Sequence, residues 1–425
     1  MEPDILTGIP VTTLVAIITF FGGLGGGLVF PIMPALGLDL GIPAFMVGLI
    51  LASNRIARLF FNLPAGHLFH LLGPRLLLAL AMLIETVGML GFSLALQTSE
   101  PALVLLVSRF VHGIGMGFLL VGAQAAVLSY SDRGNRGRKT AAVRIAMNTA
   151  VPGGVVVGGL LADLYTNNAA FLSGAAVSFA GGIVALLFLP RPPAKIPETG
   201  VAPSAGDAAY GIRALLRSPN LPALASAWCF NMLIFMTVQG VILCTLVLLA
   251  QERGISMAGF GPQGTSGLLM AVMMGVAALS AIVMGRAIDA IRYRSTPLIP
   301  SLLGLALGFV ILGIAQTLPM MLLGAVVTGL SYNSVTMPMM ALLGDAAGER
   351  QHGPAAATFQ LFGDIGGTIG PILGIEMAIR VGLEPLYLSL SVLIALAVFV
   401  ALWLRGYEKR RFAAETADKT AGDPA

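Results

Sequence analysis

Residues 386–404 read LYLSLSVLIALAVFVALWL and contain no charged side chain. A helix rises about 1.5 Å per residue, so a run of this length can cross the hydrocarbon core of a bilayer, which is roughly 30 Å thick. Arg405 ends the run, and Lys409, Arg410 and Arg411 follow it. An apolar run with such a basic flank is typical of a transmembrane helix that ends in the cytoplasm.

The composition extends this interpretation to the whole chain. Of its 425 residues, 57% are hydrophobic and 10% are charged, and the mean hydropathy is +0.90. Soluble domains carry roughly 25% charged residues, so a water-exposed surface cannot be built from this sequence. Backbone polar groups in lipid must be hydrogen-bonded within each segment, which favours helices. The predicted fold class is an all-α polytopic membrane protein.

Apolar runs separated by polar or turn-forming residues predict twelve transmembrane helices. Their expected limits are 10–36, 44–70, 75–97, 101–130, 140–163, 169–189, 222–250, 265–288, 297–316, 319–345, 355–380 and 384–405. A proline-rich polar stretch separates the sixth run from the seventh and is typical of a linker. We therefore predict an N-terminal six-helix bundle (1–189), a cytoplasmic linker (190–221), a C-terminal six-helix bundle (222–405) and a cytoplasmic tail (406–425). The polar tail is expected to be disordered.

Charge asymmetry predicts the orientation of the chain. With a cytoplasmic N-terminus, 18 of the 24 Lys and Arg residues fall on the cytoplasmic side, Arg253 and Arg380 fall on the opposite side, and four arginines lie within the spans. Such a bias places both termini and the linker in the cytoplasm. We expect a multi-pass protein of the inner (cytoplasmic) membrane of the cell.

The two halves of the chain repeat each other. A shift of 216 residues brings Gly113 onto Gly329 and Gly154 onto Gly370. Duplicated six-helix halves are typical of secondary transporters, whose substrate site lies between the halves near the middle of the membrane.

Three local patterns carry a family resemblance. Residues 66–75 read GHLFHLLGPR, similar to a G-x-L-x-D-R-x-G-R-K loop, and residues 285–294, GRAIDAIRYR, are their counterpart. Residues 109–115 read RFVHGIG and resemble an R-x-x-x-G-x-G element. The fifth and eleventh spans carry glycine-proline segments around Pro152 and Pro371. With these patterns the chain resembles the major facilitator superfamily over nearly its whole length, and in particular its drug/proton antiporters.

The resemblance implies a fold and several residue roles. The fold would be two pseudo-symmetric bundles of six helices, with the first, fourth, seventh and tenth spans lining a central cavity. Arg109 would take part in proton coupling. His70 and Asp289 would occupy the gating position of the two repeated loops, although His70 stands where the family pattern has an acidic residue.

Ionisable residues within spans are costly to bury and are functional candidates by default. Arg55 and Arg58 share a face of the second span, and Asp364 lies at a similar depth in the eleventh. In the family arrangement these two spans meet, so we expect Asp364 to pair with Arg58 or Arg55 and to re-pair during transport. We also expect Asp364 to carry the coupled proton, because burial and a nearby arginine change the proton affinity of a carboxyl group in opposite directions. A permanent buried pair without a role in the cycle is the alternative. Glu85, in the third span, could neutralise Arg58 locally or be structural.

Polar residues on the presumed cavity helices of the second half could orient a substrate or bind neighbouring helices. These candidates are Asn231, Gln239, Tyr332 and Asn333. His112, one turn from Arg109, is expected to be a packed or hydrogen-bonded residue rather than a titrating one.

Several other classes of protein are excluded. The chain has no Walker A sequence and no metal-ligand cluster, and its basic residues sit in short loops, so neither ATP, a metal cofactor nor nucleic acid is expected. Cys229 and Cys244 lie roughly 22 Å apart along one predicted helix and cannot form a disulfide. Asp345 and Asp364 suggest an intramembrane hydrolase, but their flanking residues depart from the protease pattern. We expect no enzyme activity.

The predicted function is secondary transport by alternating access, with the proton as coupling ion and no cofactor. Proton-coupled efflux of small amphipathic organic compounds is the leading hypothesis. Uptake of a small organic anion is the alternative, because arginines outnumber acids within the spans, and lipid translocation is a third possibility. The partners would be a small-molecule substrate and the bilayer, and the protein would be a monomer.

Overall fold

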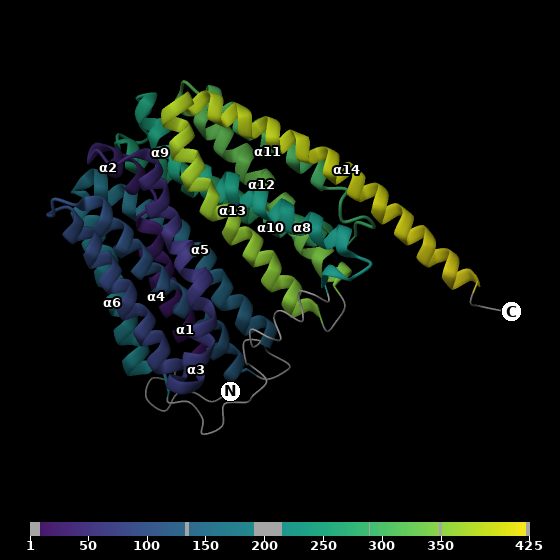
Figure 1. Cartoon of the computed structure of the whole chain (residues 1–425), viewed down its shortest axis with the longest axis horizontal. Coiled ribbons are helices and arrows are strands. Elements are labelled where there is room, and N and C mark those ends of the chain that lie inside the picture. Colours follow the sequence, from purple (N-terminus) through teal and green to yellow (C-terminus); the bar gives the residue numbers. More distant parts are fainter. Residues whose placement is uncertain (1–8, 132–135, 191–214, 289, 348–350, 422–425) are drawn as a thin grey trace. The chain divides into compact units, whose positions relative to one another are not determined.

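The computed structural model describes residues 9–131, 136–190, 215–288, 290–347 and 351–421 (Figure 1). Within these residues the protein is helical, and a single β-bridge between Met257 and Phe260 is the one extended pairing. Most of the predicted linker, residues 191–214, lies outside the described residues.

The helices fall where the sequence predicts the twelve spans. In the first half they are α1 (Val11–Leu28), α2 (Met33–Asp39), α3 (Ala44–Ala95), α4 (Pro101–Ser129), α5 (Arg136–Leu164) and α6 (Asn167–Phe188). In the second half they are α8 (Leu221–Met236), the π-helix η2 (Thr237–Ile242), α9 (Leu243–Glu252), α10 (Pro262–Ile288), α11 (Leu298–Ile314), α12 (Leu318–Ala346), α13 (His352–Val381) and α14 (Leu383–Ala421).

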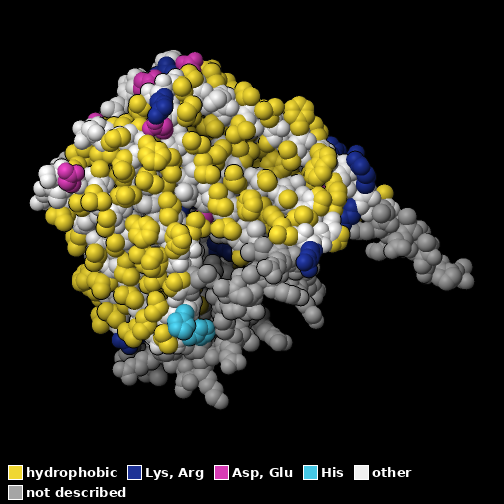
Figure 2. All heavy atoms as spheres, in the orientation of Figure 1, with side chains coloured by type: hydrophobic (Ala, Val, Ile, Leu, Met, Phe, Trp, Pro, Cys, Tyr) yellow, Lys and Arg dark blue, Asp and Glu magenta, His cyan; other side chains and the backbone are white. Residues whose placement is uncertain are grey.

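Hydropathy supports a membrane location for these helices. Ten helical segments of the described residues are long and apolar enough to cross a bilayer, and α11, with 17 residues, is a shorter apolar helix. Hydrophobic side chains cover most of the face shown in Figure 2. Large exposed side chains such as Phe60, Leu279 and Phe399 are the kind of surface that lipid, rather than water, would cover.

Two segments differ from the sequence prediction. The second and third spans form α3 with a break only at Gly73, whose φ of 70° is a left-handed conformation that glycine adopts readily. The tail expected to be disordered instead continues α14 as far as Ala421. Contacts of the tail explain this, since Glu408 Oε2 accepts a hydrogen bond from the Ser295 amide at 3.0 Å and the Tyr407 hydroxyl donates to the Pro219 carbonyl at 3.0 Å.

Packing divides the chain into two compact units. The first contains residues 1–206, 240–271 and 367–379, and the second contains 207–239, 272–366 and 380–425. The first unit therefore joins α1–α6 with α9, the start of α10 and the last part of α13. These units follow packing rather than chain order, so the bundle boundaries at 189 and 222 stay predictions.

Glycines allow α1 and α5 of the first unit to touch through their backbones. A Cβ atom added at Gly158 would lie 2.7 Å from Leu28 Cα, and one at Gly154 would lie 2.9 Å from Gly27 Cα and would also clash with the Leu24 carbonyl. Small residues permit this approach in membranes, where van der Waals packing drives helix association. The glycines of the fifth span thus form a close-packing face against α1.

We predict that Gly154→Ala lowers the melting temperature of the purified protein. The added methyl group cannot be accommodated without separating α1 from α5, and overpacking of this kind costs about 1–3 kcal/mol. Thermal denaturation in detergent measures the effect. Gly153→Ala is the matched control, because a Cβ atom at Gly153 meets nothing within 4 Å. Equal melting temperatures for the two variants would contradict the contact.

Candidate functional site

Glu85 is a residue of α3 whose side chain lies against α1 and α4 of the first unit. Its side chain is fully buried. A Cβ atom added at Gly22 of α1 would lie 2.9 Å from Glu85 Oε2, and one at Gly115 of α4 would lie 2.7 Å from Glu85 Cγ. Neither carboxyl oxygen has a hydrogen-bond partner among the described residues. Of the two roles that the sequence leaves open for Glu85, the first, local neutralisation of Arg58, is wrong because Glu85 faces the glycines of α1 and α4.

Arg109, on α4, is bound by two groups of the first span. Its Nη1 donates to the Gly26 carbonyl at 3.5 Å, and its Cζ lies 5.0 Å from the centroid of the Phe30 ring. The side chain is 1% exposed. A guanidinium over an aromatic face is stabilised by the ring quadrupole. Arg109 thus connects α4 to the C-terminal part of the first span.

His112 lies one turn further along α4 and is hydrogen-bonded, as expected. Its Nδ1 lies 2.9 Å from Asn54 Nδ2 of α3, and its Nε2 has no hydrogen-bond partner among the described residues. An amide nitrogen that donates to Nδ1 leaves the imidazole proton on Nε2. The ring therefore presents an N–H toward Gly26 of α1, whose added Cβ atom would lie 3.3 Å from His112 Cε1.

The two arginines of the second span face different helices. The guanidinium of Arg55 packs directly on Gly367 of α13, where an added Cβ atom would clash with it. Arg58 lies against α4, with its Cα 3.7 Å from a Cβ atom added at Gly117. Asp364 is buried on α13, three residues before Gly367. Arg55, and not Arg58, is thus the arginine seen in contact with α13 within the first unit. The pairing of Asp364 with either arginine stays a prediction.

The polar candidates of the second half bind neighbouring helices. Asn231 Nδ2 of α8 donates to the Phe359 carbonyl of α13 at 2.6 Å, and Asn333 Nδ2 of α12 donates to the Ala277 carbonyl of α10 at 2.7 Å. Gln239 Nε2 donates to the Tyr332 hydroxyl at 3.1 Å. Gln239 lies in the π-helix η2, a distortion that is frequent at functional sites. The structure thus brings Gln239 and Tyr332 together.

The gating candidates of the repeated loops have different surroundings. His70 is exposed on α3, and Asp289 lies outside the described residues.

In the second unit, Arg294 Nε forms an ion pair with Asp345 Oδ2 at 2.8 Å, and Asp345 is half exposed. An exposed, paired Asp345 is unsuited to the shared carboxyl pair of an intramembrane protease. Among the residues that the structure describes, no three His, Cys, Asp or Glu side chains cluster as metal ligands would.

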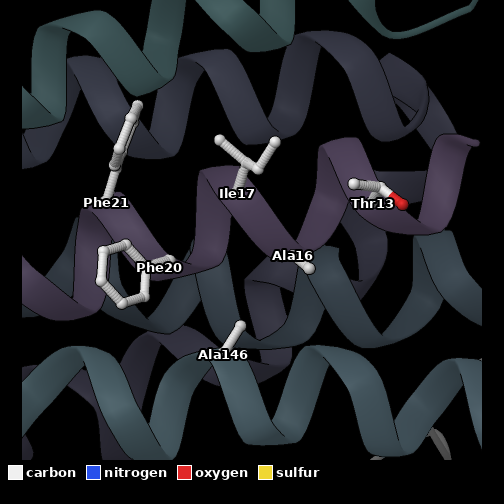
Figure 3. A pocket seen from close by; sticks show the side chains of 6 residues that line it. All are labelled: Thr13, Ala16, Ile17, Phe20, Phe21 and Ala146. Carbon is white, nitrogen blue, oxygen red and sulfur yellow. The ribbon is translucent and has the colours of Figure 1, made fainter. Parts of the chain in front are cut away.

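An apolar hollow lies between α1 and α5 of the first unit. Its volume is about 440 Å³. In Figure 3 five side chains project from α1 and Ala146 of α5 faces them. The lining residues are Thr13, Ala16, Ile17, Phe20, Phe21 and Ala146. This hollow was not predicted from the sequence, although Thr13, Ala16, Ile17 and Phe20 share one helical face through their i, i+3, i+4 and i+7 spacing.

The carboxylate of Asp163, at the end of α5, sits at the start of α10 in the same unit. Its Oδ2 accepts a hydrogen bond from the Gly264 amide at 2.6 Å, and the amides of Gly261 and Gln263 also bind the carboxylate. The first amides of a helix lack partners within the helix and favour negative charge. Sequence reasoning missed Asp163 because a carboxylate at the end of a span is ordinarily interfacial.

Comparison with known proteins identifies the family. The sequence model described as Major Facilitator Superfamily matches residues 15–275 and 245–422. The chain belongs to the major facilitator superfamily. This confirms the family resemblance, and as a member of that superfamily the protein is a multi-pass membrane transporter and not an enzyme.

Several curated proteins resemble this superfamily member. The 3-(3-hydroxy-phenyl)propionate transporter of Escherichia coli (strain K12) is 27% identical over 300 residues, or 70% of each chain. Multidrug resistance protein 1 of Bacillus subtilis (strain 168) is 27% identical over 188 residues, 44% of this chain and 47% of that protein. Quinolone resistance protein NorA of Staphylococcus aureus is 24% identical over 152 residues, 36% and 38% of the two chains. The matches to both resistance proteins thus span less than half of their length.

Solved structures share the fold of the superfamily. The nucleoside transporter NupG has a TM-score of 0.72 at 15% identity and covers 93% of this chain and 99% of its own. A bacterial homologue of the human lysosomal transporter Spinster has a TM-score of 0.71 at 12% identity, with 100% of both chains covered. The predicted fold of two six-helix bundles is confirmed, while identities this low carry no information on substrate.

Proposed function

We propose that this transporter exports small amphipathic organic compounds in exchange for protons, by alternating access. The observation that carries the proposal is the hollow between α1 and α5, whose walls are two phenylalanines and small aliphatic side chains with Thr13 as the one hydroxyl in the lining. Such a surface suits the apolar part of a ligand, because ligand pockets are mostly apolar with a few polar groups. The Gln239–Tyr332 pair would orient a polar group.

Protons would be the coupling ion, and no cofactor is needed. Arg109 and Asp364 are buried ionisable residues within helices, and residues of this kind mark proton pathways in membrane proteins. Positive charge concentrated in loops on one side favours cytoplasmic termini in the inner membrane. We propose that the protein works as a monomer, since each chain contains both six-helix halves.

We predict that Phe20→Ala weakens transport of an amphipathic cation such as ethidium. Removal of the ring takes away apolar surface from the hollow, and a loss of about 1.4 kcal/mol in binding raises KM about tenfold. Uptake into inverted proteoliposomes with an imposed pH gradient measures it. Phe45→Ala, which alters an exposed phenylalanine of α3, is the control and should leave KM unchanged. The proposal would be refuted if ethidium transport did not depend on the pH gradient and was unchanged in Phe20→Ala.

Uptake of a small organic anion is the second candidate. It is supported by the relative named as a 3-(3-hydroxy-phenyl)propionate transporter, by the buried Arg109 of α4 and by the half-buried Arg55 and Arg58 of α3. An aromatic carboxylate such as phenylpropionate, tested in right-side-out proteoliposomes, separates the two candidates. Accumulation of the carboxylate driven by an inward proton gradient, with no ethidium transport, would favour uptake.

We predict that exchanging the charges of Arg55 and Asp364 restores transport that each single variant loses. Arg55→Asp and Asp364→Arg each leave a charge without its partner, which costs about 3–5 kcal/mol when buried. The double variant re-forms an ion pair in the opposite sense. Transport by the three variants at matched expression measures the effect, and Arg58→Asp with Asp364→Arg is the comparison pair. Rescue by the Arg58 pair alone would show that the wrong arginine was chosen.

A further inference from the structure

Among the residues that the structure describes, three buried polar groups without hydrogen-bond partners lie against Gly22, Gly25 and Gly26, the glycine face of α1. They are the carboxyl of Glu85 on α3, the Nε2 of His112 on α4 and the hydroxyl of Ser178 on α6. Each side chain is 0% exposed. Buried polar groups in folded proteins are nearly always hydrogen-bonded, so three unpartnered ones on one helix face require an explanation.

The three groups line a single face of α1. A Cβ atom added at Gly22 would lie 2.9 Å from Glu85 Oε2, and one added at Gly25 would lie 2.9 Å from Ser178 Oγ. One added at Gly26 would lie 3.3 Å from His112 Cε1. Glycines at i, i+3 and i+4 lie side by side on a helix. A side chain at any of these positions would displace the polar group opposite, so glycine is what permits α1 to cover them.

The charged and titratable groups of the helices packed around Glu85 interact with one another on α3 and α4. Arg55 and Arg58 of α3 act electrostatically on Arg109 of α4, and Arg109 and Arg58 act on His112. The parts of α1 and α6 that pack here contribute glycines and Ser178, which carry no charge. Arg109 binds Gly26 and Phe30 rather than a carboxylate. An ionised Glu85 would therefore be buried without a partner, at a cost of several kcal/mol.

We propose that Glu85 carries a transported proton, in a site that the N-terminal helices form without any residue of the substrate hollow. This inference rests on the proton coupling proposed above. While α1 covers the site, the carboxyl holds its proton, and His112 and Ser178 lie against the same glycine face of α1. To release it, α1 moves away from α3 and α4 so that water reaches the carboxyl. The O–H bond of Glu85 then breaks, a water molecule takes the proton, and Glu85 is left as a carboxylate.

Difference infrared spectroscopy of the purified protein tests the site directly. We expect a C=O stretching band of a protonated carboxylic acid at neutral pH, absent in Glu85→Gln and unchanged in Glu100→Gln, which alters an exposed carboxyl at the start of α4. Gly22→Ala should shift the same band, because the added methyl group separates α1 from the carboxyl. A wild-type spectrum that Glu85→Gln leaves unaltered shows an ionised Glu85 and overturns the proposal.

The pH profile of transport tests the coupling. The rate of wild-type transport should depend on pH. Glu85→Gln should reduce the ratio between the highest and lowest rates across the pH profile by about tenfold, and Glu85→Asp should restore part of that ratio. A band assigned to Glu85 together with an unaltered pH profile in Glu85→Gln overturns the coupling role. Wild-type transport without any response to pH would instead refute the proposed proton exchange, and the infrared band would still decide whether Glu85 holds a proton. Glu85→Gln is isosteric, and its melting temperature verifies folding.

Discussion

Replacing Asp163 by alanine should expose the buried thiol of Cys244 to alkylation. The carboxylate of Asp163 binds three amides at the start of α10, and Cys244 is buried in the same unit beside Val47, Ile375 and other apolar side chains. A helix N-terminus that loses its capping acceptor is destabilised by about 0.5–2 kcal/mol. A change of one or two kcal/mol shifts an equilibrium by a factor of roughly 5–30. Labelling of Cys244 should accelerate by a similar factor.

The chain offers a simple background for this measurement. Cys229 is exposed and Cys244 is buried, so Cys229→Ser leaves Cys244 as the reporter thiol. A membrane-permeable maleimide and mass spectrometry give the labelling rate. Asp39→Ala, which removes an exposed carboxylate at the end of α2, is the control and should leave the rate as it is in the parent. If Asp163→Ala labels no faster than this control, the contact does not hold α5 to α10.

Replacing Arg109 by glutamine should reduce pH-driven transport roughly 100-fold, equivalent to about 2.7 kcal/mol. Glutamine can still reach toward the Gly26 carbonyl, but it has no charge to interact with the Phe30 ring. Arg109→Lys should also fail to restore full activity, since an ammonium lacks the planar guanidinium that stacks on an aromatic face.

Another arginine of the spans provides the control for this loss. Arg144 lies exposed on α5, and Arg144→Gln should transport at the wild-type rate. Initial rates in proteoliposomes at matched protein density measure both variants, and melting temperatures verify that they fold. Equal losses in the Arg109 and Arg144 variants would show that net charge, rather than the contacts of Arg109 with α1, sets the rate.

The sequence alone was enough to predict the twelve helices, the family and the ionisable residues within the spans. These features are local, because an apolar run and its flanking charges determine where a helix crosses the membrane. It also located the glycine-proline segments of α5 and α13, and a 3.6-residue period places Gly154 and Gly158 on one side of α5. The helical tail of α14 was missed because its stabilising contacts, Glu408 with Ser295 and Tyr407 with Pro219, come from residues far away in the chain.

Only the tertiary structure decided which partner each buried polar side chain meets. Glu85 faces Gly22 rather than Arg58, Asn231 binds a carbonyl of α13, and Asp163 binds an amide 101 residues further along the chain. Helical periodicity gives the face of a residue but not the helix packed against that face. In lipid the hydrophobic pattern distinguishes inside from outside weakly, so close packing between small residues determines the pairing of helices. That packing placed Glu85 under the glycines of α1.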